Sequence, residues 1–193
     1  MRIMQLLWLS SCLGAVAHAE QAVIDNSGQS DHGVLALNQA AGNANQQGNL
    51  QAVAVSTTAS HANVFLPQQQ SANTTAAMAD AHASITGAAF SGSQGLMAIN
   101  QTAGNANQSL NTFSLAVSPQ PHVTTLPSAA ADSLLADTAG SSPTVTTTGS
   151  SGHVQTDISA AAFQGSRGLV QLNQIAGSHN QAVNVVAVQW ANP

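Results

Sequence analysis

The residues of this chain that could do chemistry are few and scattered. After residue 19 the sequence holds six histidines, seven acids, one arginine and no lysine. A metal site needs two or more ligands on one face, with a carboxylate nearby. Only one of the histidines lies inside a repeated phrase; the others lie in polar segments or just ahead of an expected strand. We therefore expect no metal site at His32, His61, His82, His122, His153 or His179.

Catalysis by a nucleophile is not expected either. Serines are abundant, but none stands in a Gly-x-Ser-x-Gly turn between a strand and a helix, which would raise its nucleophilicity. The acids are too sparse to form catalytic pairs, so Asp25 and Asp157 are interpreted as charges at strand edges. Arg167, just before Gly168, is interpreted as a solvated turn residue. The sequence predicts no enzyme, no cofactor and no small-molecule substrate.

The charge balance also excludes two classes of partner. One arginine against seven acids gives −6 for residues 20–193, and charged residues make up only 5% of the chain. Nucleic acids and anionic membranes are bound through clustered lysine and arginine, which this sequence lacks. Small and amide residues dominate instead, a composition typical of a closely stacked backbone or of disorder.

A phrase of nine residues occurs three times. It reads NQAAGNANQ from Asn38, NQTAGNANQ from Asn100 and NQIAGSHNQ from Asn173. The similarity extends without gaps over Gly33–Val55, Gly95–Val117 and Gly168–Trp190. Internal repeats of this clarity indicate a stacked architecture.

Each repeat alternates apolar and polar residues on both sides of a glycine. A period of two, with β-branched members, indicates a strand before the first asparagine and another after the last one. Between them, Gly42, Gly104 and Gly177 permit a positive φ, and the asparagines tolerate left-handed conformations. The predicted fold class is therefore all-β, with three imperfect strand-turn-strand repeats stacked as a short β-solenoid or cross-β arch.

The repeats are separated by segments rich in Ser, Thr, Ala, Pro and Gln, which indicate irregular linkers. A short helix over Ser128–Ala139 is the one exception expected. An upstream strand is expected in each repeat, because the segment from Ile85 to Phe90 matches Ile158 to Phe163; the first repeat has Ile24 but no matching Phe. The expected organisation is repeat 1 at 20–55, a linker at 56–81, repeat 2 at 82–117, a linker at 118–155 and repeat 3 at 156–193.

The amide residues are the candidate functional residues. If equivalent strands stack in register, identical amides lie one strand spacing apart and can hydrogen-bond along a ladder, since each carries donors and acceptors. Like charges at that spacing would repel. The predicted ladder comprises Asn38, Gln39, Asn45, Gln46, Asn49, Asn100, Gln101, Asn107, Gln108, Asn111, Asn173, Gln174, Asn180, Gln181 and Asn184.

The N-terminus indicates export. Met1-Arg2, the apolar stretch Ile3–Val16 and Ala17-His18-Ala19 form a secretory signal peptide, with cleavage expected between Ala19 and Glu20. The alternative is lipidation, because Leu9-Ser10-Ser11-Cys12 loosely resembles a lipoprotein cleavage site. Cleavage after Ala19 leaves no cysteine and hence no disulfide.

The repeated phrase resembles those of the Fap functional-amyloid subunits of pseudomonads and, more distantly, those of curli. Such subunits combine a secretion signal with three imperfect repeats and variable linkers. The resemblance implies secretion through the periplasm, passage through an outer-membrane pore with the help of chaperones, and assembly with copies of itself and related subunits into biofilm fibres.

Three functions stay open on the sequence alone. The first is a fibre subunit or its nucleator. The second is a tethered or secreted β-solenoid adhesin, which would need polar end caps. The third is a disordered accessory protein that regulates fibre assembly. No cap is evident beside the first or the third repeat, which favours the first function.

Overall fold

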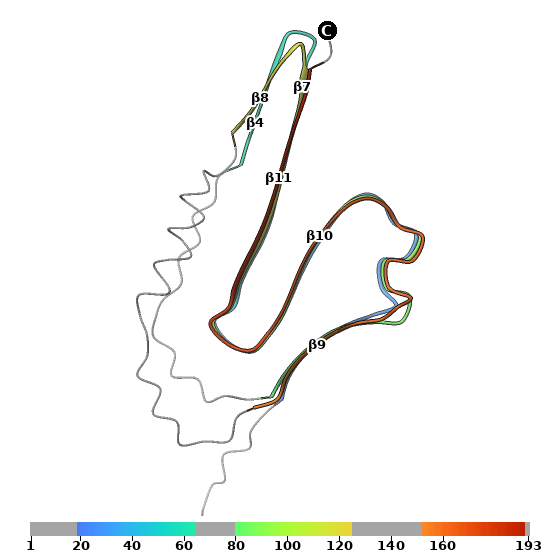
Figure 1. Ribbon diagram of the computed structural model, residues 1–193, viewed down its shortest axis with the longest axis vertical. Helices are drawn as coiled ribbons and strands as arrows, with labels where there is room; N and C mark the ends of the chain where they lie inside the picture. Colours follow the sequence, from blue (N-terminus) through green and yellow to red (C-terminus); the bar gives the residue numbers. More distant parts are fainter. Residues whose placement is uncertain (1–18, 65–79, 125–151, 192–193) are drawn as a thin grey trace, which may run out of the picture.

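The computed structural model describes residues 19–64, 80–124 and 152–191. Residues 1–18, with the expected signal peptide and Cys12, lie outside these ranges, as do the expected helix and most of the linkers. The regular structure of the described residues consists of strands (Figure 1). They are β1 (Glu20–Asp25), β2 (His32–Ala41), β3 (Gln46–Val55), β4 (Ala59–Asn63), β5 (Ala81–Thr86), β6 (Gln94–Ala103), β7 (Gln108–Ser118), β8 (Gln120–Thr124), β9 (Val154–Ile158), β10 (Arg167–Ala176) and β11 (Gln181–Ala191).

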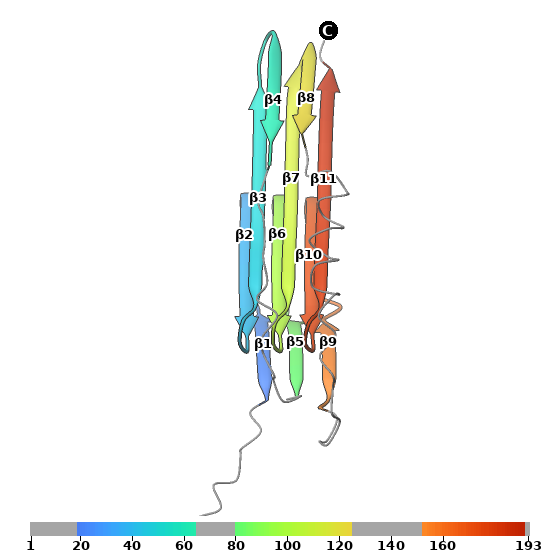
Figure 2. The same ribbon diagram turned by 90° about the vertical axis from the view of Figure 1, so that its left-hand side faces the viewer.

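The strands form three rungs of nearly identical path. Rung 1 comprises β1–β4, rung 2 comprises β5–β8 and rung 3 comprises β9–β11. Viewed along the stack, the three rungs superpose as one serpentine line (Figure 1). Viewed from the side, they lie next to one another with rung 2 in the middle (Figure 2). The predicted fold class, a stack of strand-turn-strand repeats, is confirmed.

All four sheets are parallel and run across the rungs. Their strand orders are β1-β5-β9, β10-β6-β2, β11-β7-β3 and β4-β8. The register is the one that the repeated phrase predicts: Asn38 pairs with Asn100, and Asn100 pairs with Asn173. The upstream strands follow the same rule, since Ile24 pairs with Ile85 and Ile85 with Ile158. A one-residue slip would turn the buried side chains to the opposite face, so the alternating pattern fixes this register.

The turn between the two long strands of each rung is built on glycine. Gly104 has a φ of 113°, and a Cβ atom there would lie 1.8 Å from the backbone oxygen of Gly177. The non-glycine residues with left-handed conformations in these turns are Ala44, Ala106 and His179, rather than the asparagines. The neighbouring asparagine uses its amide for the turn, because Asn45 Nδ2 donates to the backbone oxygens of Ala41 and Gly104.

The largest apolar core lies between the β1-β5-β9 sheet and the β10-β6-β2 sheet. Its buried members are Ile24, Ile85, Ala89, Phe90, Met97 and Ile99. Phe90 is stacked on Phe163 of rung 3 with 5.1 Å between ring centroids. Rung 1 has no phenylalanine here, and its bend is one residue shorter than that of rung 2. Gly28 of rung 1 leaves space for the Phe90 side chain, because a Cβ atom on Gly28 would lie 2.7 Å from the Phe90 ring.

Each of the two linkers, which the sequence predicts to be mostly irregular, contains one short strand. β4 and β8 form a two-stranded parallel sheet inside the expected linkers and pack against the ends of β3, β7 and β11 (Figure 2). Ser60 Oγ donates to Ser118 Oγ across this contact, over 3.0 Å. Because the buried residues of β4 are Ser60 and Ala62, the strand lacks the large apolar side chains by which strands are recognised in a sequence.

Candidate assembly interface

The central ladder is formed by two columns of asparagines that face each other inside the arch. One column comes from β2, β6 and β10, the other from β3, β7 and β11. In the middle rung, Asn100 Nδ2 donates to Asn38 Oδ1 and to Asn49 Oδ1, each over 2.9 Å. Asn111 Nδ2 donates to Asn100 Oδ1 over 3.1 Å. The two columns are therefore joined across the arch as well as along the stack.

A second ladder joins the central sheet to the β1-β5-β9 sheet. Gln101 Nε2 donates to Gln39 Oε1 of rung 1, and Gln174 Nε2 of rung 3 donates to Gln101 Oε1. Gln101 Nε2 also donates to the backbone oxygen of Ser84 on β5, over 2.8 Å. Each glutamine thus fixes the spacing between two sheets and the register between two rungs.

A third ladder follows the turn. Asn107 Nδ2 donates to Asn45 Oδ1, and Asn180 Nδ2 donates to Asn107 Oδ1, each over 3.1 Å. Next to it, Gln108 Nε2 donates to Gln46 Oε1 over 3.4 Å, and Gln181 of rung 3 lies in register with Gln108.

The asparagine column of β3, β7 and β11 is bonded along the stack in the same way. Asn111 Nδ2 donates to Asn49 Oδ1, and Asn184 Nδ2 donates to Asn111 Oδ1.

All the hydrogen bonds between ladder side chains of neighbouring rungs point in the same direction. In every one, the amide nitrogen of the higher-numbered rung donates to the oxygen of the rung below it. A net contribution of about 1 kcal/mol for each bond stabilises the stack. Leaving one such group buried without a partner costs about 1–3 kcal/mol. The ladders therefore favour the aligned stack strongly over a slipped one.

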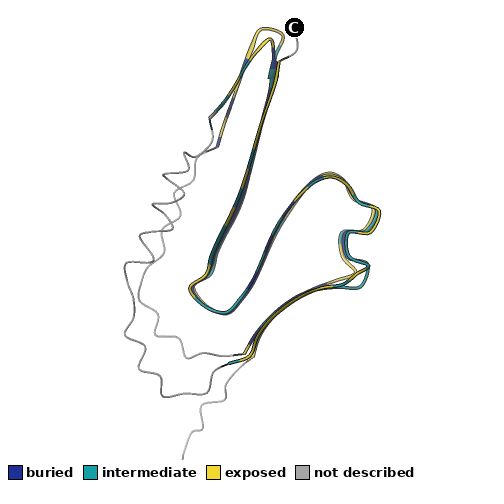
Figure 3. Cartoon of the chain, viewed as in Figure 1, coloured by how far each residue is buried: buried dark blue, intermediate teal, exposed yellow. Residues whose placement is uncertain are grey.

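The middle rung shows what a rung becomes when it has neighbours on both sides. Asn100, Gln101, Asn107 and Asn111 are all 0% exposed. In rung 1, Asn38 is exposed and the other equivalents are half-buried. Exposed positions include the bends and the tip, and β9 of rung 3 is exposed along its whole length (Figure 3). A fully enclosed row of amides is stable because each has a partner above and below.

Rungs 1 and 3 present open strand edges. β2 and β3 are the last strands of their sheets at one end, and β10 and β11 are the last at the other. Soluble proteins usually blunt such edges with lysine, proline or a covering element. The chain has no lysine, and the strands of these two sheets contain no proline. Neither edge is covered by any other strand of the described ranges.

The titratable residues make few contacts with one another in the part of the chain that the structure describes. His82 Nε2 and Asp157 Oδ2 form a hydrogen bond over 3.0 Å. His61 and His122 are paired in register, with ring centroids 5.4 Å apart. No group of three or more potential metal ligands occurs among these residues. No helix in these ranges could cross a membrane.

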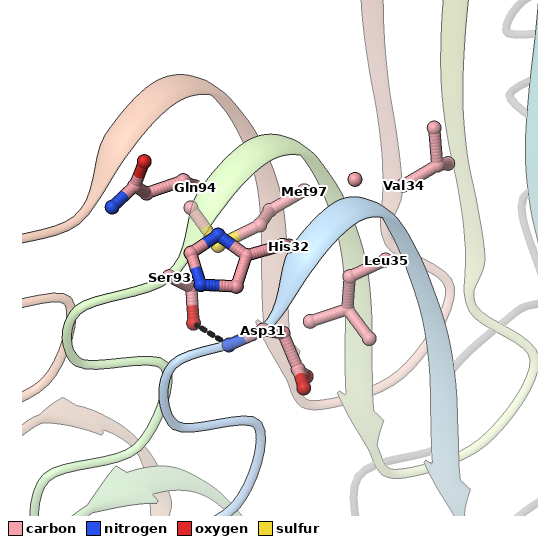
Figure 4. A pocket seen from close by; sticks show the side chains of 8 residues that line it. Asp31, His32, Val34, Leu35, Ser93, Gln94 and Met97 are labelled. Atoms are coloured by element: carbon pink, nitrogen blue, oxygen red, sulfur yellow. Dashed lines mark hydrogen bonds between the residues drawn. The ribbon is translucent and has the colours of Figure 1, made fainter.

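Each outer rung carries a shallow hollow. The hollow at rung 1 lies at the bend before β2 and is lined by residues that include Asp31, His32 and Gln94 (Figure 4). The hollow at rung 3 lies between β10 and β11 and includes Gln171 and Val186. The hollow at rung 1 also includes Ser93, but its Oγ donates to the backbone oxygen of Gly28 and accepts from the backbone N–H of Asp31, and no hydrogen bond among the described residues joins it to His32.

The structure brings every residue of the predicted ladder into register with its equivalents in the other rungs. Gly42, Gly104 and Gly177 lie at the turn with positive φ. Glu20 begins β1, directly after Ala19 at the edge of the described residues. Sequence reasoning missed the bond from Gln47 Nε2 to Thr102 Oγ1, because neither residue type recurs in all three repeats.

Comparison with known proteins gives one family. The model of the functional amyloid protein FapB/FapC family matches residues 10–191. No solved structure matches the chain.

Proposed function

The chain belongs to the functional amyloid protein FapB/FapC family, and from this membership we propose that it assembles head to tail, with rung 1 of one copy stacked on rung 3 of another. Membership makes it a functional amyloid protein, a subunit of extracellular fibres. Head-to-tail contact uses two different surfaces and does not close on itself, so it yields a filament. Each added copy restores the environment of the middle rung to two outer rungs.

One bond of the asparagine ladder carries this proposal. Asn100 Oδ1 accepts from both Asn111 and Asn173, whereas Asn173 Oδ1 accepts from Asn184 alone. At the other end, Asn38 accepts two bonds but its Nδ2 donates none within the described residues. Asn38 Nδ2 of rung 1 is therefore an unused donor, and Asn173 Oδ1 of rung 3 can accept one more hydrogen bond. In a head-to-tail stack, Asn38 of the incoming copy would donate to Asn173.

The chain without its signal peptide, beginning at Glu20, tests the proposal. Incubated alone, it should form unbranched fibres after a lag, and fragments of those fibres should remove the lag. A protein that stays monomeric at high concentration, with a β-rich spectrum and no response to seeds, would contradict the proposal and favour a capped solenoid acting as an adhesin. Seeding by fibres of a related subunit would distinguish a nucleator from a major subunit.

The route of export is part of the proposal. The N-terminal pattern supports cleavage after Ala19 in the periplasm, followed by passage through an outer-membrane pore with the help of chaperones. Cells without that pore should retain the cleaved chain in the periplasm. Extracellular fibres in such cells would contradict this route without affecting the head-to-tail contact.

A further inference from the structure

The amide ladders are the same in every rung, so they cannot by themselves decide which chain is added to an open end. A rung of any related repeat would satisfy them equally well. Selection has to come from residues of rung 1 and rung 3 that differ from their equivalents in rung 2. Two such pairs lie at the ends of this stack.

The first pair is charged. Arg167 is the only lysine or arginine among the described residues, and it lies in register with Gln94 and His32. The residue before His32 is Asp31, whose backbone N–H donates to Ser93 Oγ (Figure 4). Within one chain, the neutral residues of rung 2 separate the arginine from the aspartate. In the head-to-tail stack, Arg167 would lie in register with His32 of the added copy, one strand spacing of about 4.8 Å away and one residue from its Asp31.

The second pair is polar and buried. Gln171 is 3% exposed, and its Nε2 donates to the backbone oxygen of Thr112, while its Oε1 has no partner. Gln51 of rung 1 has a buried Nε2, also without a partner. Side chains two residues apart in a strand share a face, so both glutamines point into the arch, as Asn173 and Asn49 do. Gln171 Oε1 of rung 3 therefore lacks a donor, and Gln51 Nε2 of rung 1 lacks an acceptor.

Rung 2 shows why these glutamines do not meet within a chain. Its equivalents are Ala98, in register with Gln171, and Phe113, in register with Gln51. The hollow between β10 and β11 includes Gln171 and Val186, and it lies where the Gln51 side chain of an added copy would enter. The two end surfaces therefore carry opposite charges and unpaired hydrogen-bonding groups of opposite kind.

We propose that the Arg167–Asp31 and Gln171–Gln51 contacts select a second copy of this same chain, docked with its rung 1 on rung 3. The inference rests on the head-to-tail stacking proposed above and adds the residues that select the partner. An exposed ion pair contributes little to stability, so the charged contact acts mainly by rejecting a wrong partner.

Charge-swap variants test the inference through elongation rates of self-seeded fibres at low salt. Asp31→Arg alone places two arginines at the junction, and Arg167→Asp alone places two aspartates there. Each variant should elongate about two- to five-fold more slowly than the unchanged chain, the size expected of an exposed ion pair. An equimolar mixture of the two variants at the same total concentration should elongate at about 60–75% of the original rate. Half of the copies that reach a fibre end are then of the unlike kind, and a junction between unlike copies has opposite charges.

The mixture separates this inference from simpler causes. A variant that folded badly would stay slow in the mixture, whereas a charge effect is largely relieved there and also fades in 1 M salt. Thr57→Arg, an exposed position of rung 1 at the far tip, adds a cation away from the junction and should elongate normally. A mixture no faster than the average of its two components would overturn the charged contact, even if all the variants form fibres. Absence of fibres from the unchanged chain would instead overturn the proposed function.

The glutamine contact has its own measurement. Gln51→Met keeps the length of the side chain but removes the donor, which leaves Gln171 Oε1 unpaired at the junction. The concentration of monomer in equilibrium with fibres should rise about five-fold, the equivalent of one net hydrogen bond. An unchanged equilibrium concentration would show that these amides do not meet.

Discussion

Asn173 donates its side-chain amide to Asn100 Oδ1 over 2.9 Å, although 73 residues separate the two in sequence. Asn100 in turn donates to Asn38 over the same distance. This repeated bond joins the three rungs through one column of asparagines, of which Asn100 is fully buried and Asn38 is exposed. It also gives the stack a direction, with unused donors at rung 1 and unused acceptor capacity at rung 3. The account of assembly depends on that direction.

Charges in the ladder should block assembly. Replacing Asn100 and Asn107 by aspartate, and Gln101 and Gln108 by glutamate, removes buried donors and stacks carboxylates against oxygen atoms. No fibres should form in the time that the unchanged chain needs to assemble fully, as followed by sedimentation. Deletion of Pro67–Thr75 removes no ladder residue and should leave assembly nearly intact. Equal assembly of the two variants would show that the amides are only polar filler.

The turn glycine of the middle rung should resist substitution. A Cβ atom at Gly104 would lie 1.8 Å from Gly177 O, and the φ of 113° is itself unfavourable for alanine. Gly104→Ala should therefore abolish seeded elongation. Gly165→Ala is the control, since that glycine also has a positive φ but has nothing within 4 Å of its Cβ position. Similar elongation of both variants would mean that rungs need not approach closely at the turn.

The phenylalanine pair should contribute strongly to fibre stability. Phe90 is 1% exposed and stacked on Phe163, so Phe90→Ala should cost about 3–5 kcal/mol through lost packing. Guanidinium dissociation of the fibres measures this loss as a lower midpoint. Phe113→Ala, at a half-buried position, should lower the midpoint less. An equal or larger effect at Phe113 would place the main core in the other half of the rung.

The exported protein should begin at Glu20. Cleavage after Ala19 removes Cys12 with the signal peptide, so the intact mass of the extracellular protein should correspond to residues 20–193. A mass that includes an acylated N-terminal Cys12 would contradict this prediction and favour a membrane-tethered adhesin.

Much of the fold could be predicted because the repeats encode it directly. Asn38, Asn100 and Asn173 stand at the same offset in three gapless repeats, and that offset is the observed register. The glycine turns followed from the same alignment. Strands β4 and β8 could not be found in this way, since Ser60 and Ala62 supply little apolar pattern and β8 includes Pro121. Their pairing depends on contacts with the ends of β3, β7 and β11.

The interface was less accessible to sequence reasoning than the ladder. Arg167 was interpreted as a solvated turn residue, and within the single chain it is exposed. Its relation to Asp31 emerges only when the register of three rungs is continued into a second copy. Gln51 and Gln171 do not align with each other in the repeats, so no spacing in the sequence connects them. Their missing partners become visible only in the packed arch.

The axial rise per subunit in mature fibres, measured by electron cryomicroscopy, tests the central claim most directly. Three rungs per chain with a strand spacing of about 4.8 Å predict a subunit rise of about 14 Å along the fibre axis. Each subunit should contribute all three rungs, with rung 3 in contact with rung 1 of the next copy. A subunit rise of about 4.8 Å, with the three repeats of one chain side by side in a single layer, would contradict the account.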